Sequence, residues 1–194
     1  MEKNRKKRTM TLLMKILPII YFSLTILLLA ACEHDNTDRW KFRKYSDNTR
    51  TPKLARDIFA NRQWDLSEES HALALLDSLN AKEIEARPFY FKVVTLTYAK
   101  SDGSFSEGLG NAGYDYVKDN TSEFLNYFIG DNSFTKDDLK IWANIILLEL
   151  SISAEDNLQQ GILNYIKELK SKKLSTEQTA VLDEFCLLLK TTQQ

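Results

Sequence analysis

A cysteine stands directly behind two small residues near the start of the chain, in the stretch Leu29-Ala30-Ala31-Cys32. An apolar run over residues 16–29 leads into this stretch, and a positively charged region precedes the run. The charges come from Lys3, Arg5, Lys6, Lys7 and Arg8. Small residues before the cut are what signal peptidases require. The stretch therefore predicts cleavage between Ala31 and Cys32 and a chemical role for the Cys32 thiol.

This arrangement resembles the signal of bacterial lipoproteins. The resemblance implies that the Cys32 thiol receives a diacylglyceryl group, that the chain is cut before Cys32, and that the new N-terminus is acylated. Two or more acyl chains hold a protein stably on a membrane, whereas a single chain binds only marginally. The resemblance also implies membrane lipid as a partner through Cys32 and a place in the bacterial cell envelope, on the outer membrane and facing the periplasm or the surface.

An uncleaved membrane span and an ordinary secretory signal are the alternatives for this segment. A spanning helix needs about 20 apolar residues, and here Lys15 and Pro18 interrupt the run. A secretory signal lacks a second good cleavage site, because Ala30 and Ala31 lead straight into Cys32. We therefore favour the lipoprotein signal for residues 1–31.

Removal of residues 1–31 leaves 163 residues, which is enough for one domain with a proper core. The removed segment carries six basic residues and one acid, so the net charge changes from −1 to −6. This acidic balance argues against nucleic acid, whose binding requires a basic face. With Cys32 lipidated, Cys186 is the one thiol left, and its apolar neighbours predict that it is buried and unreactive.

Residues 32–52 are polar and are predicted to form a lipidated tether ahead of a helical domain over residues 53–194. Glu33, Asp35 and Asp38 follow the lipid site and loosely resemble the acidic export tag of surface lipoproteins of Bacteroidota. Cations and aromatic rings then alternate at Arg39, Trp40, Lys41, Phe42 and Arg43. Such a segment can lie against an anionic membrane surface. We favour the alternative, in which Trp40 and Phe42 dock on the first helix of the domain.

From Thr51 onward, apolar residues recur at helical spacing between start and stop signals. Helices are expected to begin near residues 53, 66, 86, 104, 121, 135, 154 and 175. The start signals pair Asp65 with Glu68, Asn120 with Glu123, Thr135 with Asp138, Ser153 with Asp156, and Ser175 with Gln178. The predicted fold class is all-α, as an irregular antiparallel helical bundle or a short αα-superhelix of pairs similar to HEAT or tetratricopeptide arrays. No consensus repeat of either array is visible.

Residues 108–113 spell G-x-G-x-x-G, the pattern of a dinucleotide-binding turn. That turn needs its first glycine directly after a buried strand, but residues 101–107 are polar and intervene. We therefore expect no nucleotide here. Instead, these glycines are expected to lie in a helix that runs through Val117 and to let a neighbouring helix approach closely.

The sequence offers little for metal binding or catalysis. His71 follows Glu68 at a helix start and is expected on a solvated face. Asp131, Asn132, Asp137 and Asp138 depart from the calcium-loop spacing, so capping and turn roles account for them better. A glycosidase needs two carboxylates in one cleft, and no pattern selects a pair from candidates such as Glu83, Glu85, Glu107 and Glu123. We predict no metal, no cofactor and no catalytic residues.

The aromatic residues give the best indication of function. Phe89, Tyr90 and Phe91 occupy consecutive helical positions, so they cannot all face one core. A groove with exposed tyrosines suits a peptide, a protein loop or a glycan, and the candidates for it are Tyr90, Tyr98, Tyr114 and Tyr116. The more ordinary interpretation is that these rings fill gaps between helices.

Two classes of function follow from these observations. The first is a non-enzymatic, lipid-anchored helical module that holds an envelope or surface protein partner. The alternative is an envelope hydrolase or glycan-handling protein that uses carboxylates the sequence does not single out.

Overall fold

The computed structural model describes residues 36–130, 133–154 and 157–191. The predicted signal segment, its cleavage point and Cys32 lie outside the described residues, as do Glu33 and Asp35. The chain divides between Lys41 and Phe42 into two units. The domain discussed below is the second unit, residues 42–194.

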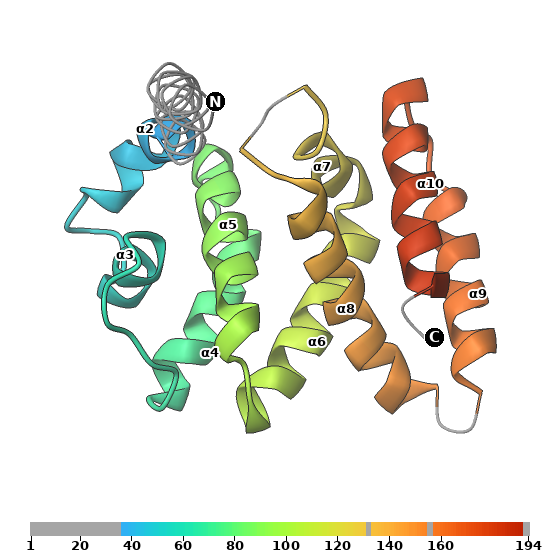
Figure 1. Ribbon diagram of the computed structural model, residues 1–194, viewed down its shortest axis with the longest axis horizontal. Coiled ribbons are helices and arrows are strands. Elements are labelled where there is room, and N and C mark those ends of the chain that lie inside the picture. The colour runs from blue at the N-terminus through green and yellow to red at the C-terminus, as the bar shows by residue number, and fades with distance from the viewer. Residues whose placement is uncertain (1–35, 131–132, 155–156, 192–194) are drawn as a thin grey trace, which may run out of the picture. The chain divides into compact units, whose positions relative to one another are not determined.

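All regular secondary structure in the described residues is helical (Figure 1). The α-helices are α2 (Asn36–Ser46), α3 (Lys53–Phe59), α4 (Glu69–Asp77), α5 (Arg87–Thr97), α6 (Gly103–Asp119), α7 (Thr121–Asn126), α8 (Lys136–Ser153), α9 (Leu158–Lys170) and α10 (Thr176–Thr191). Short 3-10 helices occupy Ser78–Asn80, Ile84–Ala86 and Tyr98–Lys100. The prediction of an all-α helical bundle is confirmed.

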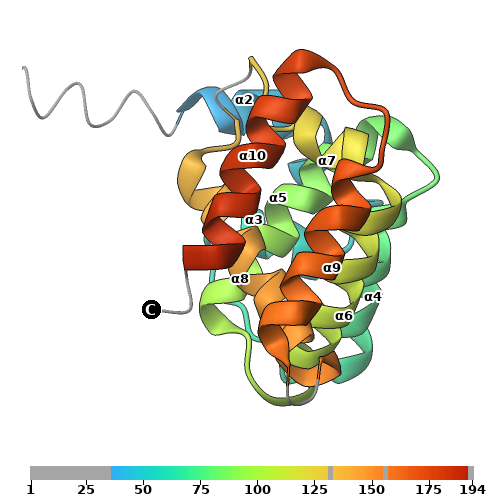
Figure 2. The ribbon, with the colours of Figure 1, turned by 90° about the vertical axis from the view of Figure 1, so that its right-hand side faces the viewer.

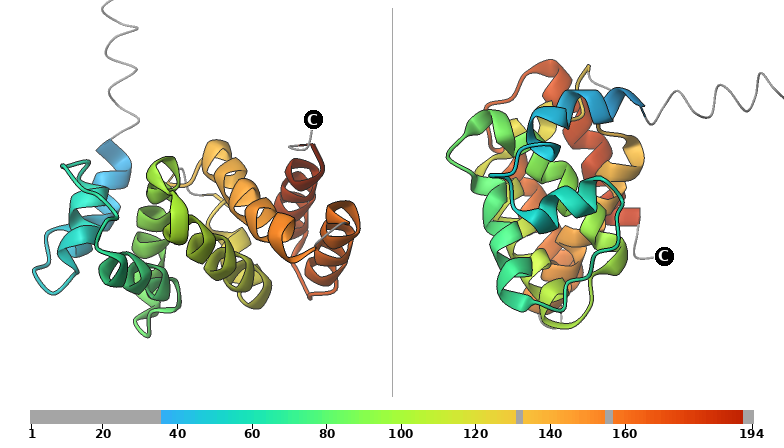
Figure 3. Two further views of the ribbon diagram at one scale, coloured as in Figure 1. Left: turned by 90° about the horizontal axis from the view of Figure 1, so that it is seen from below. Right: turned by 90° about the vertical axis from the view of Figure 1, so that its left-hand side faces the viewer.

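The helices of the domain lie in two layers. Figure 3 (left) shows α5, α8 and α10 in one row and α4, α6 and α9 in the other. Figure 2 shows α9 and α10 side by side at the C-terminal end of the domain. Because the connections are short, helices that follow one another between the layers run antiparallel.

The domain begins earlier in the chain than residue 53. The helix α2 crosses the division between the two units, and Phe42 and Tyr45 near its end are buried. The Phe42 ring centroid lies 5.7 Å from that of Phe59 and 6.2 Å from that of Phe89. Burial of a phenylalanine side chain contributes about 1.5–3 kcal/mol. The predicted tether is therefore wrong for residues 42–52, which belong to the packed domain.

Two of the predicted capping boxes are present. The Asp138 amide donates to Thr135 Oγ1 at 3.2 Å, and the Thr135 amide donates to Asp138 Oδ2 at 2.8 Å. Ser175 and Gln178 make the same reciprocal pair at 3.2 and 2.9 Å. Lys92 Nζ also donates to Asp138 Oδ2 at 2.8 Å, which joins α5 to the start of α8. The capping signals thus place the starts of α8 and α10 correctly.

Two further predicted starts are wrong. The helix α4 begins at Glu69, after a loop in which Asp65 Oδ1 accepts a hydrogen bond from the Ser67 amide at 3.1 Å. The helix α9 begins at Leu158, where Asn157 Oδ1 accepts from the Gln160 amide at 3.0 Å. The reason is that Asp and Ser stabilise turns as well as helix starts, and sequence spacing alone does not separate the two uses.

The helix α5 is buried on more than one side. Phe89 packs against aromatic rings of α2 and α3. Its ring centroid lies 5.3 Å from that of Phe59. Phe91 stacks on Trp142 of α8, with 4.4 Å between centroids and 4° between ring planes. The two phenylalanines thus face different surroundings, as predicted, yet both are buried because α5 lies between α3 and α8.

The helices α6 and α8 approach each other closely at glycine positions. A Cβ atom on Gly110 would lie 3.3 Å from the Glu149 backbone nitrogen. A Cβ atom on Gly113 would lie 2.6 Å from Ile145 Cγ2 and 3.4 Å from Trp142 Cζ3. The G-x-G-x-x-G stretch lies within α6. The prediction that its glycines permit close helix packing is confirmed.

Gly113→Ala is expected to lower the free energy of unfolding by about 1 kcal/mol. The new methyl group gains about 1 kcal/mol of helix propensity, but overpacking a tight core costs about 1–3 kcal/mol. We expect the cost of overpacking to exceed the gain in helix propensity, because Ile145 is β-branched, fully buried and unable to move aside. Urea unfolding followed by circular dichroism measures the change.

Gly108→Ala is the matched control. Its Cβ atom would meet Leu73 Cδ2 at 3.0 Å, the end of a partly exposed side chain that can rotate away. This variant is expected to be as stable as the wild type or up to about 1 kcal/mol more stable. Equal destabilisation by both substitutions would contradict the close approach at Gly113.

Candidate functional site

An open groove of about 690 Å³ lies between α4, α6 and α8. We call it the acidic groove and define it by Leu73, Asp77, Glu107, Gly108, Glu149 and Ile152. A Cβ atom on Gly108 would lie 3.0 Å from Leu73 Cδ2 and 3.4 Å from Leu76 Cδ1, so this glycine lets α4 pack closely on α6 beside the groove. The glycines of α6 therefore serve the packing against both α4 and α8.

Three carboxylates from three helices face this space. Asp77 ends α4, Glu107 lies on α6 and Glu149 on α8. Within the described residues, none of the three forms a salt bridge, and no Lys or Arg side chain lines the groove. The groove thus carries negative charge that is not neutralised at close range by this chain's described cations.

Two large apolar side chains are exposed in the same groove. Leu73 is 39% exposed and Ile152 is 56% exposed. The helical spacing of Leu73, Leu76 and Leu79 predicts one buried stripe, and this is wrong for Leu73, which lies at the open groove between α4 and α6. Exposed apolar area with a polar border marks a contact surface.

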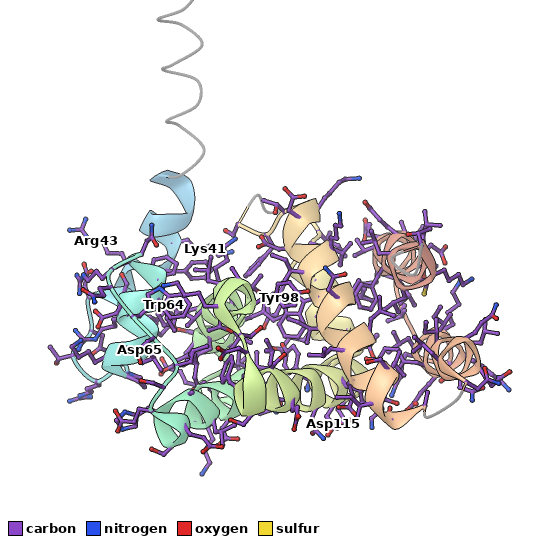
Figure 4. The ribbon with its side chains drawn as sticks, turned by 60° about the horizontal axis from the view of Figure 1, so that its bottom comes forward. Lys41, Arg43, Trp64, Asp65, Tyr98 and Asp115 are labelled. Carbon is purple, nitrogen blue, oxygen red and sulfur yellow. The ribbon has the colours of Figure 1, made fainter. Side chains whose placement is uncertain are left out.

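The candidate tyrosine groove is wrong for Tyr116. Tyr116 is only 1% exposed, and its hydroxyl donates to Tyr127 Oη at 3.2 Å inside the domain. Figure 4 places Tyr98 and Asp115, the residue just before Tyr116, on opposite sides of α6. The side chain at 116 points inward because it continues the stripe of α6 that faces Trp142, 6.0 Å away between centroids.

The remaining three tyrosines are half-buried and serve separate packing contacts. Tyr114 stacks near Tyr165 of α9, with 4.5 Å between centroids, and its carbonyl oxygen accepts a hydrogen bond from the Tyr165 hydroxyl at 3.1 Å. Tyr90 packs at 5.3 Å against Phe89, and Tyr98 caps the end of α5. For Tyr114 and Tyr116 the structure shows the ordinary interpretation, in which these rings fill gaps between helices.

The predicted membrane-apposed segment needs one correction. Phe42 is 2% exposed within the core, so it cannot lie on a membrane, and its packing on α3 agrees with the docking alternative. Lys41 and Arg43 are exposed, and the Arg43 side chain points outward in Figure 4. The side chains of Arg39 and Trp40 lie outside the described part of the chain.

A polar network lies beside α7 and uses one of the candidate carboxylates. Glu123 Oε1 accepts a hydrogen bond from the Tyr127 hydroxyl at 2.7 Å, and the Tyr116 hydroxyl lies 3.3 Å from the same oxygen. Glu123 Oε2 accepts from Arg87 at 2.9 Å. Because the carboxylate has partners on both oxygens, its geometry identifies it as a structural link between α5, α6 and α7.

The tyrosines of the domain give an expected pH dependence. Burial raises the pKa of Tyr116, Tyr127 and Tyr165 above the ordinary value of about 10. At pH values between the tyrosine pKa of the unfolded chain and that of the folded chain, the unfolded chain has lost these protons while the folded chain keeps them. The free energy of unfolding therefore falls as pH rises. We expect the free energy of unfolding to be level up to about pH 9 and to fall steeply above about pH 10.

Alkaline titration followed by tyrosinate absorbance and by circular dichroism tests this. The buried tyrosines are expected to ionise only together with loss of helix. Tyr127→Phe removes one of these groups, so the fall in stability per pH unit is expected to become shallower. Ionisation of all tyrosines near pH 10 in a fully helical protein would contradict the prediction.

The remaining candidates take ordinary structural roles. Glu83 and Glu85 both lie near Lys44, at 3.9 and 3.0 Å from its Nζ, on a different part of the domain from Glu107. His71 is exposed beside Glu68, as predicted. Cys186 is buried, also as predicted, and burial raises the pKa of its thiol. Asp138 is a capping residue, and Asp131 and Asn132 lie outside the described residues.

Comparisons of the chain with protein-family models, with curated proteins and with solved structures found no match. Among the described residues, no helix combines the length and the apolar character needed to cross a membrane. Function is therefore inferred below from the residues and geometry of this chain.

Proposed function

We propose that this chain is a lipid-anchored lipoprotein of a bacterial cell envelope whose helical domain binds a partner protein and catalyses no reaction. The acidic groove is the observation that carries the binding role. It joins exposed apolar side chains, Leu73 and Ile152, with charged groups that have no described ion-pair partner. An open groove of this kind suits contact over an area more than the exclusion of water that chemistry favours.

The anchor is supported by the resemblance of Leu29-Ala30-Ala31-Cys32 to lipoprotein signals. Phe42 is the first residue of the packed domain, and it follows Cys32 by ten residues. Such a chain spans at most about 36 Å. The proposed anchor would thus keep the domain near the membrane surface, where its partner would be concentrated with it.

Affinity capture from membranes of the source cell tests the binding role. The full chain serves as bait, together with a Glu107→Arg/Glu149→Arg variant of the acidic groove. A Glu168→Arg/Glu177→Arg variant is the matched control, because both glutamates are exposed and lie outside the groove, on α9 and α10. We expect a partner that the wild type and the control retain and that the groove variant loses. A set of captured proteins that is the same for all three chains would overturn the binding role of the groove.

A further inference from the structure

We infer that the acidic groove takes a basic, amphipathic peptide segment of the partner protein, with Lys or Arg one helical turn from apolar residues. This inference rests on the proposed function and adds the chemistry of the partner. The supporting observations are the charge state of the groove, the order of its side chains and the exposure of its apolar residues.

The groove brings together three carboxylates from three helices, none with an ion-pair partner among the described residues, although some single surface acids, such as Asp102 and Glu177, are also unpaired. Several surface carboxylates are matched by this chain's own cations, as in Asp115 with Lys118 at 3.0 Å and Glu184 with Lys136 at 2.9 Å. Asp77, Glu107 and Glu149 are not matched in this way among the described residues. A partner with Lys or Arg side chains would supply the missing opposite charge, and like charge would be repelled.

On each wall of the groove, α4 and α8, an apolar side chain and an acid lie one helical turn apart, and Glu107 of α6 lies level with the apolar pair. On α4, Leu73 precedes Asp77 by four residues, and on α8, Ile152 follows Glu149 by three. The contacts of Gly110 with Glu149 and of Gly113 with Ile145 show that α8 runs antiparallel to α6. The helix α4 runs parallel to α6 (Figure 1).

The helices α4 and α8, which form the two walls of the groove, therefore each place their apolar residue nearer the start of α6 and their acid nearer its end. Residues four apart on a helix lie on the same face. A segment with an apolar residue and a basic residue one turn apart would match each wall, and an amphipathic helix in a groove is an established mode of recognition. Exposed charge pairs are individually weak, so the apolar contacts supply affinity and the charges supply selection.

Fluorescence anisotropy with designed peptides tests the inference. The protein is the full chain held in nanodiscs of zwitterionic phosphatidylcholine, which do not attract basic peptides by charge. The first probe is a fluorescent peptide of about 14 residues with Leu and Lys at amphipathic helical spacing. The second has Glu in place of every Lys, and the third has the composition of the first in scrambled order.

We expect the Leu/Lys probe to bind more tightly than the other two, and its binding to weaken as salt is added. Glu107→Gln/Glu149→Gln is expected to reduce its affinity about threefold to tenfold, from two exposed charge pairs. Glu168→Gln/Glu177→Gln, the matched control outside the groove, is expected to change the affinity less than about twofold. Unchanged circular dichroism of each variant confirms that the fold is intact.

Equal binding of the Leu/Lys and Leu/Glu probes, or an affinity that the groove variant leaves unchanged, would overturn the inference. The capture experiment separates this failure from that of the proposed function. If a captured partner depends on the groove while the Leu/Lys probe does not, the binding role stands and the basic chemistry of the partner is wrong.

Discussion

Trp142→Ala is expected to lower the free energy of unfolding by about 3–5 kcal/mol, the range for loss of a large aromatic side chain from a core. Trp142 is fully buried and stacks on Phe91 with 4.4 Å between ring centroids. Its Nε1 donates a hydrogen bond to Thr95 Oγ1 at 2.8 Å. Because small domains are stable by only about 5–15 kcal/mol, this variant would lose a large share of its stability. Urea unfolding measures the loss.

Two controls separate the contributions of this residue. Trp142→Phe keeps a ring against Phe91 but loses the hydrogen bond and some volume, so a smaller loss of about 1–2 kcal/mol is expected. Trp64→Ala removes a half-buried ring that packs on the edge of the core and has Lys100 Nζ 4.0 Å from its centroid. We expect a loss of about 1–2 kcal/mol there. A Trp142→Ala protein as stable as Trp64→Ala would contradict the central place of Trp142 in the core.

Cys32→Ser is expected to abolish incorporation of labelled fatty acid into the chain. The serine hydroxyl cannot replace the thiol that receives the diacylglyceryl group in the lipoproteins that this signal resembles. The variant is also expected to accumulate as a longer precursor that keeps residues 1–31. Metabolic labelling with an alkyne fatty acid, followed by gel electrophoresis, measures both effects in a bacterial host.

Cys186→Ser is the matched control, because it removes the other cysteine of the chain. The Cys186 thiol is buried in the core of the domain, so it is not accessible to a lipid-transferring enzyme. This variant is expected to incorporate the label like the wild type. Label that persists in Cys32→Ser and disappears in Cys186→Ser would refute the assignment of the lipid site.

The helices could be predicted because their signals are local. Thr135 and Asp138 lie three residues apart and form a reciprocal cap, so sequence spacing alone determines the start of α8. The start of α4 is less certain from sequence, because Asp65 can form a turn with Ser67 as readily as a helix cap. Local patterns thus predict that helices exist more reliably than where each begins.

The burial of particular side chains depends on contacts that sequence does not reveal. Tyr116 is buried by Tyr127, which follows α7, and by Trp142 of α8, and Leu73 is exposed because it lines the open groove between helices. For Phe42 and Tyr45 a signal existed, since two aromatic residues three positions apart mark one helical face. The docking of Phe42 on the domain could therefore be predicted, whereas the predicted start of the domain, at residue 53, is too late.

The acidic groove could not be predicted from the sequence. Its acids stand at positions 77, 107 and 149, on three helices that no local pattern brings together. Each one alone is an ordinary acid at a helical position, exposed for Asp77 and Glu107 and half-buried for Glu149. Their common location follows from the packing of α4 and α8 around α6, for which the glycines of α6 are the one sequence feature that gives a hint.

Mass spectrometry of the N-terminal peptide of the membrane-bound protein tests the central claim most directly, namely that this domain is held on an envelope membrane by lipid. The expected peptide begins at Cys32 and carries a diacylglyceryl thioether and an acylated amine. A peptide that begins at Met1, or one that begins at an unmodified Cys32, would contradict the claim.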